Sequence, residues 1–424
     1  MRYHIESFGR RSAAKRHIAG FALLAAALVV TTFAAQSAPA QTFTSLYSFP
    51  AGQTGPGPDG ASPGATNLLI NPSGILIGST QEGGDQACDP PYGCGVVFMI
   101  SPTGNETVLH RFAGSAAGDG SSPGGLVLDN KKGLLYGVAS GGGAESSGCV
   151  YGCGTVFSID YNGKETTLHS FTGSPDGNLP LGNLVLDSAG NLYGTTYYGG
   201  NPNFGSGPGT VFEINSSGAE SILYSFTEQP NGTNPYSGLI RDAAGNLYGA
   251  TVYGGSGSCN NGFLPGCGIV FKVDPSGNET VLYNFTGGTD GQYPGSLIMD
   301  AAGNLYGKAV YNTYGEVFKI DTAGNFSILY NGSFAALIES IILGPSGSFY
   351  GTATGGNSSC SGGCGSVFQL AQDSSGNWRG KILHSFDGTD GSEPDSLVLN
   401  NGVLYGTTFM GGTSNYGTVF KLVP

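Results

Sequence analysis

Histidine, aspartate and cysteine side chains recur at fixed places in this sequence and are the first candidates for chemistry. His110, His169 and His384 each follow a leucine in a short apolar stretch. Histidine is the commonest general acid or base in enzymes. Comparable stretches carry tyrosine at the same place, however, so we interpret the histidines as packing residues of a repeated strand. The equivalent tyrosines are Tyr47, Tyr224, Tyr283 and Tyr330.

Known catalytic motifs give no support for an enzyme. The sequence contains no His-Glu-x-x-His segment and no Gly-x-x-x-x-Gly-Lys-Ser/Thr loop, which are the patterns of one class of zinc site and of phosphate-binding loops. A glycosidase-type pair of carboxylates from distant segments would leave no local pattern and stays open. We predict no catalytic residue, no metal and no cofactor.

A second recurring element is Asp-Gly-x-x-Pro, with Asn for Asp in one copy. The Asp side chain can bond to nearby backbone, Gly allows a positive φ, and Pro fixes the direction in which the chain leaves. We interpret the element as a turn. A rim of metal-binding carboxylates is the alternative, but the sequence lacks the Asp-x-Asp-x-Asp-Gly pattern of calcium loops. The six copies are 59–63, 119–123, 176–180, 231–235, 290–294 and 390–394.

Eight cysteines fall into four close pairs. An even number, local pairing and an export signal together indicate disulfides. Zinc would need two more ligands near each pair, which the neighbouring sequence does not supply. We predict that Cys88 pairs with Cys94, Cys149 with Cys153, Cys259 with Cys267, and Cys360 with Cys364.

The elements that hold these residues must be strands and turns. Of 424 residues, 76 are Gly and 22 are Pro, which excludes a mainly helical protein. The chain is 39% hydrophobic and 11% aromatic, which is too apolar for a disordered chain. We therefore expect a fold rich in strands and turns.

The first forty residues have the three parts of a secretory signal. Five Arg and Lys precede His17, an apolar run follows from Ile18 to Ala35, and Ala38-Pro39-Ala40 is a cleavage site. We expect cleavage before Gln41, a secreted chain in the extracellular space or periplasm, and no membrane insertion after cleavage. An uncleaved anchor is the alternative, and Arg10-Arg11 also permits a twin-arginine route.

The mature chain is strongly acidic. Removal of residues 1–40 takes away five basic residues and one Glu, and changes the formal net charge from −13 to −17. Such a surface repels phosphate backbones and anionic lipids. We expect no nucleic-acid partner, and we expect a monomer.

Seven copies of one pattern fill residues 41–424. Their anchors are glycines spaced 44 to 59 residues apart, most of which end an Asn-Leu-Tyr-Gly tetrapeptide. Within the third copy, four apolar stretches alternate with turn residues, at 183–187, 191–196, 209–214 and 221–226. Four short strands that must be covered on both faces predict a propeller blade. The anchors are Gly78, Gly137, Gly194, Gly249, Gly307, Gly351 and Gly406.

The two ends of the mature chain are complementary. It begins with a fourth-type strand at 43–49 and finishes with a third-type strand at 417–422. We therefore predict an all-β, seven-bladed β-propeller of four-stranded antiparallel blades, in which the N-terminal strand completes the last blade. This closure leaves no exposed sheet edge. A β-solenoid or two stacked β domains are the alternatives.

The repeated Gly-Asn-Leu-Tyr-Gly-Thr-Thr, Gly-Gly, Gly-Thr-Val-Phe-Lys and Leu-Tyr-Ser-Phe elements resemble those of a known family. They are similar to the tandem repeat of the extracellular bacterial proteins called choice-of-anchor tandem repeat GloVer-containing proteins. The resemblance covers nearly all of 41–424 and implies an exported repeat protein without an assigned biochemical role. A C-terminal sorting segment, common in that family, is not seen before Pro424, which argues against surface anchoring.

One region departs from the repeat. The loop between Tyr306 and Phe318 lacks the Gly-Gly and Cys elements, and the next connection lacks Asp-Gly-x-x-Pro. Two shortened loops would leave a notch in the face that carries the long loops, where tyrosine could stack on a sugar or peptide. Simple decay of the repeat is the alternative. The candidate ligand-binding residues are Tyr311, Asn312, Tyr314 and Glu339.

Three functions fit this sequence. The first is an exported propeller that binds a glycan, peptide or partner protein through its loop-rich face. The second is an extracellular hydrolase or lyase with its site at the mouth of the central channel. The third is a structural component. Carboxylates that converge at the centre would favour an enzyme, and a tyrosine-rich rim would favour binding.

Overall fold

A computed structural model describes residues 41–424 except 54, 65–66, 147, 205, 228–229, 260–264, 313, 332–335, 356–359 and 361–362. The predicted signal segment, 1–40, lies outside the described residues and stays a prediction. In the described part, regular structure is β-strand apart from three short 3₁₀ turns, at Ser115–Ala117, Pro202–Phe204 and Pro345–Gly347. None of its helices is long and apolar enough to cross a membrane.

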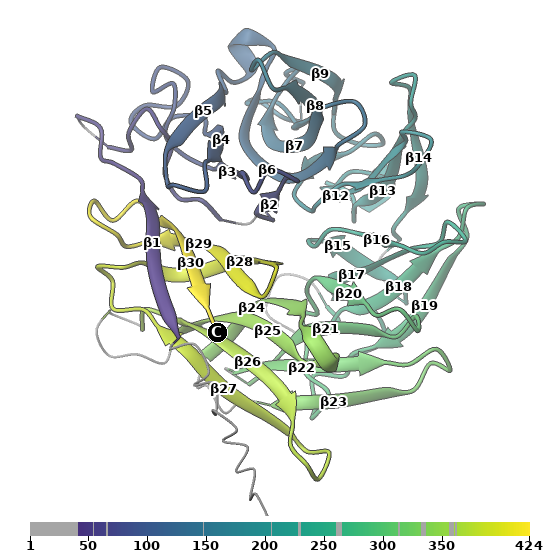
Figure 1. Cartoon of the computed structure of the whole chain (residues 1–424). Helices are drawn as coiled ribbons and strands as arrows, with labels where there is room; N and C mark the ends of the chain where they lie inside the picture. Colours follow the sequence, from purple (N-terminus) through teal and green to yellow (C-terminus); the bar gives the residue numbers. More distant parts are fainter. Residues whose placement is uncertain are drawn as a thin grey trace, which may run out of the picture. The chain divides into compact units, whose positions relative to one another are not determined.

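The strands form seven antiparallel sheets around a common centre, which confirms the predicted seven-bladed propeller (Figure 1). In blades 1 to 6 the chain runs from the innermost strand to the outermost. The first four blades are β2 (Leu69–Ile70), β3 (Leu76–Thr80), β4 (Val96–Ile100) and β5 (Glu106–Arg111); β6 (Gly120–Asp129), β7 (Leu134–Gly142), β8 (Thr155–Asp160) and β9 (Glu165–Ser170); β10 (Asn178–Pro180) with β11 (Val185–Leu186), β12 (Leu192–Tyr198), β13 (Thr210–Ile214) and β14 (Glu220–Ser225); and β15 (Gly232–Pro235) with β16 (Ile240–Arg241), β17 (Leu247–Gly254), β18 (Ile269–Val273) and β19 (Glu279–Asn284).

The last three blades follow the same order, and the seventh closes the ring. In blade 7 the N-terminal strand pairs with the C-terminal one, from Thr42 opposite Val423 to Ser48 opposite Thr418. The predicted closure by the N-terminal strand is therefore confirmed. These blades are β20 (Leu297–Met299), β21 (Leu305–Tyr311), β22 (Tyr314–Ile320) and β23 (Phe326–Asn331); β24 (Ala336–Leu343), β25 (Phe349–Gly355), β26 (Ser366–Gln372) and β27 (Trp378–Ser385); and β28 (Ser392–Asn400), β29 (Val403–Met410), β30 (Thr418–Val423) and β1 (Thr42–Ser48).

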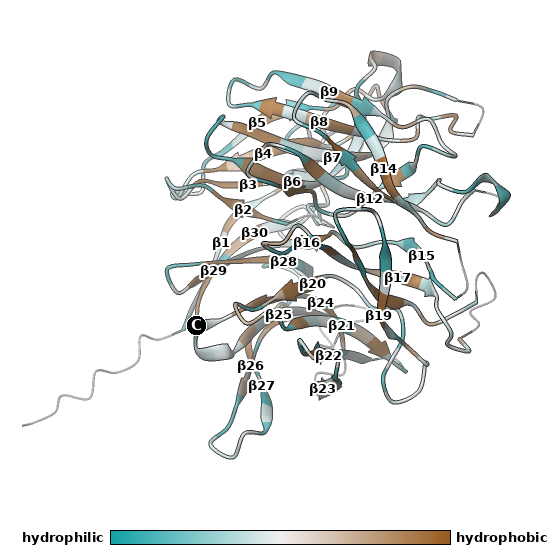
Figure 2. Cartoon of the chain, turned by 90° about the vertical axis from the view of Figure 1, so that its right-hand side faces the viewer, coloured by the Kyte–Doolittle hydropathy of each residue, from teal (hydrophilic) through white to brown (hydrophobic). Residues whose placement is uncertain are grey.

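The anchor glycine of each repeat makes room for a phenylalanine of the same blade. A Cβ added to Gly194 would lie 2.5 Å from the Cζ of Phe212, which is fully buried on the neighbouring strand. The same contact recurs in all seven blades, so this glycine is needed for packing. Figure 2 shows hydrophobic residues gathered in the strands and hydrophilic ones in the connections.

The Asp-Gly-x-x-Pro element joins six of the seven blades to the one before it, with blade 6 as the exception. In blade 4, Asn234 has a φ of 59° and donates its backbone N–H to the carbonyl of Pro208 at 2.7 Å. A Cβ added to Gly209 would lie 2.6 Å from the Cδ of Pro235, so proline and glycine pack directly across the junction. The equivalent N–H donors are Ser62, Ser122, Leu179, Asn234, Tyr293 and Glu393.

The two faces of the ring differ. We call the face with the connections between second and third strands and between blades the loop-rich face. The opposite face has tight turns, in which an acidic side chain holds the backbone: Asp187 accepts the N–H groups of Ala189 and Asn191, each at 2.9 Å. Tyr193 donates to the same carboxylate at 3.2 Å, so the tyrosine of the Asn-Leu-Tyr-Gly element anchors a turn.

Candidate functional site

All four predicted disulfides are present, and they stabilise the loop-rich face. The second cysteine of each pair is followed by a glycine and then by the first residue of the third strand. Its carbonyl accepts the backbone N–H of the next blade's junction residue, as Cys153 does from Leu179 at 3.0 Å. Disulfides also fit a protein of the extracellular space or periplasm. The pairs are Cys88–Cys94, Cys149–Cys153, Cys259–Cys267 and Cys360–Cys364.

The three histidines of the fourth strands pack as repeat residues and also bond to an aspartate. Each ring lies edge-on to a buried phenylalanine, as His169 does to Phe171 with centroids 4.7 Å apart. Each Nε2 atom also forms a hydrogen bond with the Asp side chain of the following Asp-Gly-x-x-Pro element. The pairs are His110–Asp119 at 3.2 Å, His169–Asp176 at 3.2 Å and His384–Asp390 at 2.7 Å.

Glu339, one of the predicted ligand-binding residues, lies on the inner strand of blade 6. Its Oε2 is 3.1 Å from the Nζ of Lys308 in blade 5, and its Oε1 accepts a hydrogen bond from Thr354 at 3.2 Å. Lys308 follows an anchor glycine, where other copies carry Ser, Thr, Val or Ala. The ion pair therefore belongs to this junction and not to the repeat.

Tyr236 brings an aromatic ring to the same region from blade 4. It follows the motif proline, as Asp395 does in blade 7, and Glu339 holds the matching place in blade 6. Partial burial and the negative charges of Asp395 and Glu339 raise the pKa of Tyr236, so both carboxylates lie within electrostatic reach of its phenol. The side chain of Tyr236 remains 54% exposed.

Further tyrosines extend this aromatic surface. Tyr197 lies edge-on to Tyr236, with centroids 6.3 Å apart, and to Tyr198 at 4.7 Å. Burial and three neighbouring phenols, among them Tyr253, raise the pKa of Tyr197 to about 12. Tyr253 in turn lies edge-on to Tyr293 at 5.6 Å. Five tyrosines of blades 3, 4 and 5 thus form one group near the centre of the loop-rich face.

The other predicted ligand-binding residues lie at the end of the β21–β22 hairpin. Tyr311 pairs with Tyr314 across the turn, and Asn312 occupies the turn with a φ of 54°. Alternation along β21 directs Tyr311 to the opposite face of the strand from Lys308. The structure thus brings Glu339 to the lysine of this blade and places the two tyrosines apart from that ion pair.

Two serine segments match the Gly-x-Ser-x-Gly pattern of hydrolases but do not form a nucleophile elbow. They are Gly60–Gly64, in the junction before β2, and Gly120–Gly124, which forms the beginning of the inner strand β6. An elbow needs a strand, a sharp turn and a helix. The hydroxyl of Ser62 instead contacts Glu82 at 3.4 Å, and that of Ser122 contacts the carbonyl of Gln81 at 3.3 Å.

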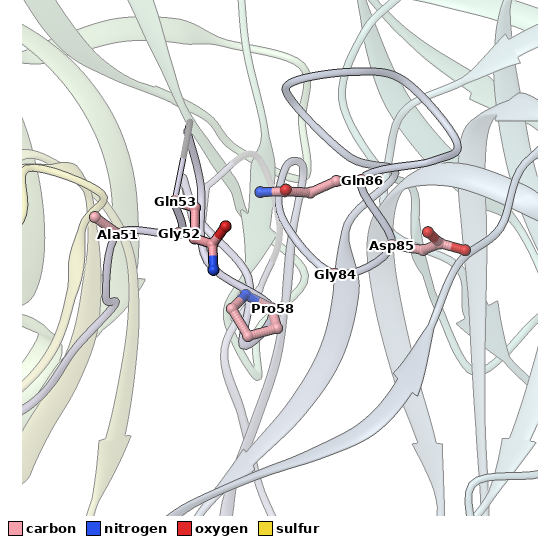
Figure 3. Close-up of a pocket in the computed structure, with 7 residues that line it drawn as sticks. All are labelled: Ala51, Gly52, Gln53, Pro58, Gly84, Asp85 and Gln86. Atoms are coloured by element: carbon pink, nitrogen blue, oxygen red, sulfur yellow. The ribbon is translucent and has the colours of Figure 1, made fainter.

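An open pocket of about 580 Å³ lies beside the connection from β1 to blade 1 (Figure 3). Its ionisable group is Asp85, which already accepts the N–H of Ala87 at 2.9 Å. Gln86 donates to the carbonyl of Pro56. These side chains hold the loop together and offer little for catalysis.

The comparisons with known proteins agree with the repeat and the fold. The model of the Gloeobacter/Verrucomicrobia repeat matches residues 151–312 and 206–420. The chain belongs to this family. No curated protein matches the sequence.

Solved structures similar to this Gloeobacter/Verrucomicrobia repeat protein are also propellers. Virginiamycin B lyase from Staphylococcus aureus has a TM-score of 0.57 at 12% identity and covers 91% of this chain and 99% of its own. A streptogramin B lyase has a TM-score of 0.57 at 11% identity over 90% and 97%. Identities this low show a shared fold alone.

The sequence analysis named Glu339 as a candidate ligand-binding residue, which stays a prediction, and it did not name the neighbouring Lys308, Tyr236 or Asp395. Each of these is a charged or aromatic residue at a repeat position that most other copies fill with small or apolar residues. A comparison of the copies position by position would have found them.

Proposed function

We propose that the protein binds a carbohydrate through the centre of its loop-rich face. The residues that we call the central site are Tyr197, Tyr236, Lys308, Glu339, Thr354 and Asp395. The observation that carries the proposal is the half-exposed ring of Tyr236, which lies within electrostatic reach of the carboxylates of Glu339 and Asp395.

The chemistry of the central site suits a neutral sugar. An exposed tyrosine ring offers a flat apolar surface and a hydroxyl at its edge. The carboxylates of Glu339 and Asp395 can accept hydrogen bonds from sugar hydroxyls, and such charged bonds are the stronger ones. The remaining N–H groups of Lys308 can donate to ring or hydroxyl oxygens. An acidic ligand is disfavoured by the formal net charge of the chain.

The hairpin with Tyr311, Asn312 and Tyr314 forms the outer part of the same proposed surface. Gly315 of this hairpin packs against the backbone of Ile338, directly before Glu339. A ligand longer than one sugar ring could therefore extend from the central site toward Tyr314, which is 40% exposed. We expect this contact to contribute less than Tyr236 does.

A lyase or hydrolase is the second candidate. Lys308, Glu339 and Asp395 are acid–base groups near the centre of a propeller, and the two lyases above share the fold. Turnover of a bound oligosaccharide would favour this function over simple binding. A peptide or protein ligand is a further alternative that the same test distinguishes.

A thermal-shift screen of the exported protein tests the proposal. Neutral oligosaccharides, peptides and calcium are added separately to the wild type, to Tyr236→Ala and to the double variant Tyr311→Ala/Tyr314→Ala. A ligand that binds the folded state raises Tm in proportion to the logarithm of its concentration. We expect a sugar-dependent rise that Tyr236→Ala abolishes and the double variant reduces. A rise with peptides alone, or one that Tyr236→Ala leaves intact, contradicts the proposal.

A further inference from the structure

The histidine–aspartate pairs lie where neighbouring blades meet, and a third side chain joins each pair from the next blade. At the boundary of blades 2 and 3 this third residue is Glu220, the first residue of β14. We propose that His169, Asp176 and Glu220 bind one divalent transition-metal ion, with zinc as the best match, and that this ion links the two blades.

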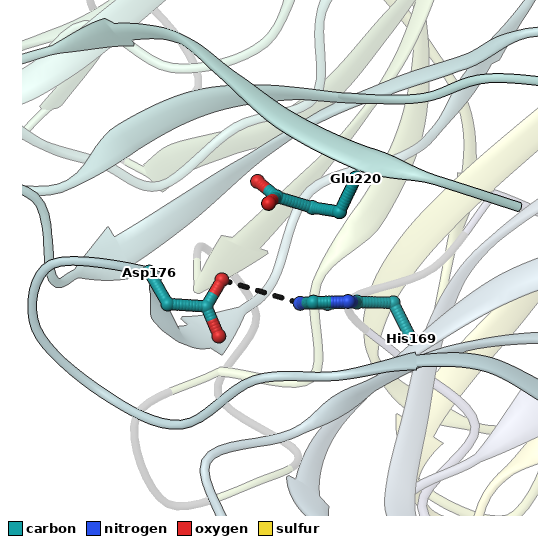
Figure 4. Close-up of side chains that lie close together, drawn as sticks. All are labelled: His169, Asp176 and Glu220. Atoms are coloured by element: carbon teal, nitrogen blue, oxygen red, sulfur yellow. Dashed lines mark hydrogen bonds and ion pairs between the residues drawn. The ribbon is translucent and has the colours of Figure 1, made fainter.

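The three side chains converge from three separate segments (Figure 4). His169 lies on β9, Asp176 in the following junction turn and Glu220 on β14. The His169 Nε2 and the Asp176 Oδ1 are 3.2 Å apart, and one ligand atom from each of the three residues lies within 4.8 Å of the other two. Two ligands about 2.1 Å from a tetrahedral zinc ion would be about 3.4 Å apart, so a small movement of Glu220 completes the set.

The aspartate is already oriented for this role. Its Oδ2 accepts hydrogen bonds from the backbone N–H of Thr172 at 2.8 Å and from the hydroxyl of Thr172 at 3.1 Å. These bonds direct Oδ1 toward His169. Hydrogen bonds of this kind to a ligating carboxylate orient it and strengthen metal binding.

The glutamate has a buried oxygen without a partner. The Oε1 of Glu220 is out of contact with water and makes no hydrogen bond. Burial and the charge of Asp176 raise the pKa of Glu220, while His169 lowers it. A divalent cation would compensate both carboxylates, and it would replace the proton that His169 shares with Asp176.

Two other blade boundaries have an aromatic ring in the place of Glu220. At the boundary of blades 6 and 7, the ring of Phe43 stacks on His384 at 3.8 Å and fills the place of the glutamate. At the boundary of blades 4 and 5, Phe326 of β23 stacks in the same way on Tyr283 of β19 at 3.9 Å. The third residue is therefore an aromatic ring at these two boundaries and a carboxylate at the boundary of blades 2 and 3.

The boundary of blades 1 and 2 has the same residue types with a different arrangement. Glu165 takes the place of Glu220 beside His110 and Asp119, but its Oε1 accepts the hydroxyl of Thr167 at 3.0 Å. Among the residues that the structure describes, His169, Asp176 and Glu220 are the one group of three such side chains that approaches closely enough for a metal ion. An imidazole with two carboxylates suits zinc and leaves a position for water.

Equilibrium dialysis with Zn²⁺ after EDTA treatment, followed by elemental analysis, tests the proposal. We expect one equivalent of zinc on the wild-type protein. His169→Gln and Glu220→Gln should each remove it, and Thr172→Val should weaken binding about 10- to 100-fold. The matched controls are His384→Gln and Glu279→Gln, which alter equivalent places without the full ligand set and should keep one equivalent.

Two results overturn the proposal. One is zinc binding that His169→Gln and Glu220→Gln leave unchanged. The other is a loss of zinc in His384→Gln as large as in His169→Gln, which would indicate non-specific binding to histidine. Tm values in EDTA establish that each variant is folded, and Co²⁺ absorption on the wild type provides a readout that does not depend on any variant.

Discussion

Two regions of the ring, within blade 3 and within blade 5, have the same backbone and different chemistry. In blade 3, the hydroxyls of Thr196 and Thr210 bond to each other at 2.7 Å in the core. In blade 5, Ala309 and Glu316 hold these places, and both carboxylate oxygens of Glu316 are buried without a hydrogen bond. At these two places, blade 3 thus has a neutral, hydrogen-bonded pair, and the departure from the repeat in blade 5 introduces a charge.

Blade 5 departs from the repeat at Lys308 and at Glu316, which lie on two paired strands. Lys308 reaches Glu339 in the next blade from the same strand that carries Ala309. Burial, together with the charge of Asp290, raises the pKa of Glu316 to about 7. A propeller of this family therefore obtains its stability from positions that recur, and its function should be sought where one copy differs from the others.

We expect the largest loss of stability from a substitution in the repeated core. Phe212→Ala empties a fully buried place against Gly194 and should lower the free energy of unfolding by about 3–5 kcal/mol. Guanidinium unfolding measures this loss. Tyr236→Ala, at an exposed position, should change it by less than about 0.5 kcal/mol. Equal losses in the two variants would remove the distinction between core and central site.

The next effect concerns the buried carboxylate of blade 5. The pKa of Glu316 is about 7 in the folded protein and 4.5 in an unfolded chain. The contribution of this carboxyl group to the free energy of unfolding is therefore fully present below pH 4.5 and is lost as the pH rises through 7. Glu316→Gln should therefore stabilise the protein at pH 8, by up to about 3 kcal/mol, and have little effect at pH 4.

Unfolding at both pH values, with Glu393→Gln as an exposed control, measures the effect of Glu316. The control should show no such difference between pH 4 and pH 8. A Glu316→Gln variant that is equally or less stable than the wild type at pH 8 would mean that the carboxylate is satisfied in the folded protein.

The disulfide of blade 2 should have a smaller effect. Replacing Cys149 and Cys153 together by serine opens a five-residue loop and should cost about 2 kcal/mol. The backbone bond from Leu179 to Cys153 remains possible, so the blades should stay joined. Val150→Ala, in the same loop and 69% exposed, should be neutral. A loss in the double variant no greater than in Val150→Ala would show that the loop needs no crosslink.

The sequence analysis predicted the fold well because each anchor acts within its own blade. Gly194 and Phe212 lie on neighbouring strands, and the same two residue types meet in every copy. The closure followed from the strand types at the two ends. The junctions were harder to predict, because Gly209 and Pro235 meet across blades and neither residue alone indicates the other.

The central site was only partly predictable for the same reason. Glu339 was found because its surroundings depart from the repeat. Tyr236 and Asp395 come from blades 4 and 7, and only the closed ring brings them near Glu339. The bond between His169 and Asp176 spans a single turn, but histidine and aspartate were interpreted separately as packing and turn residues.

The most direct test of the account is the affinity of an oligosaccharide for two tyrosine variants. Isothermal titration of the best sugar from the screen compares the wild type with Tyr236→Ala and with Tyr161→Ala, which removes a ring that is 41% exposed in a tight turn on the opposite face. We predict that Kd rises more than about tenfold in Tyr236→Ala, as for a central contact residue, and is unchanged in Tyr161→Ala. Equal affinity of Tyr236→Ala and the wild type would contradict a binding site at the centre of the loop-rich face.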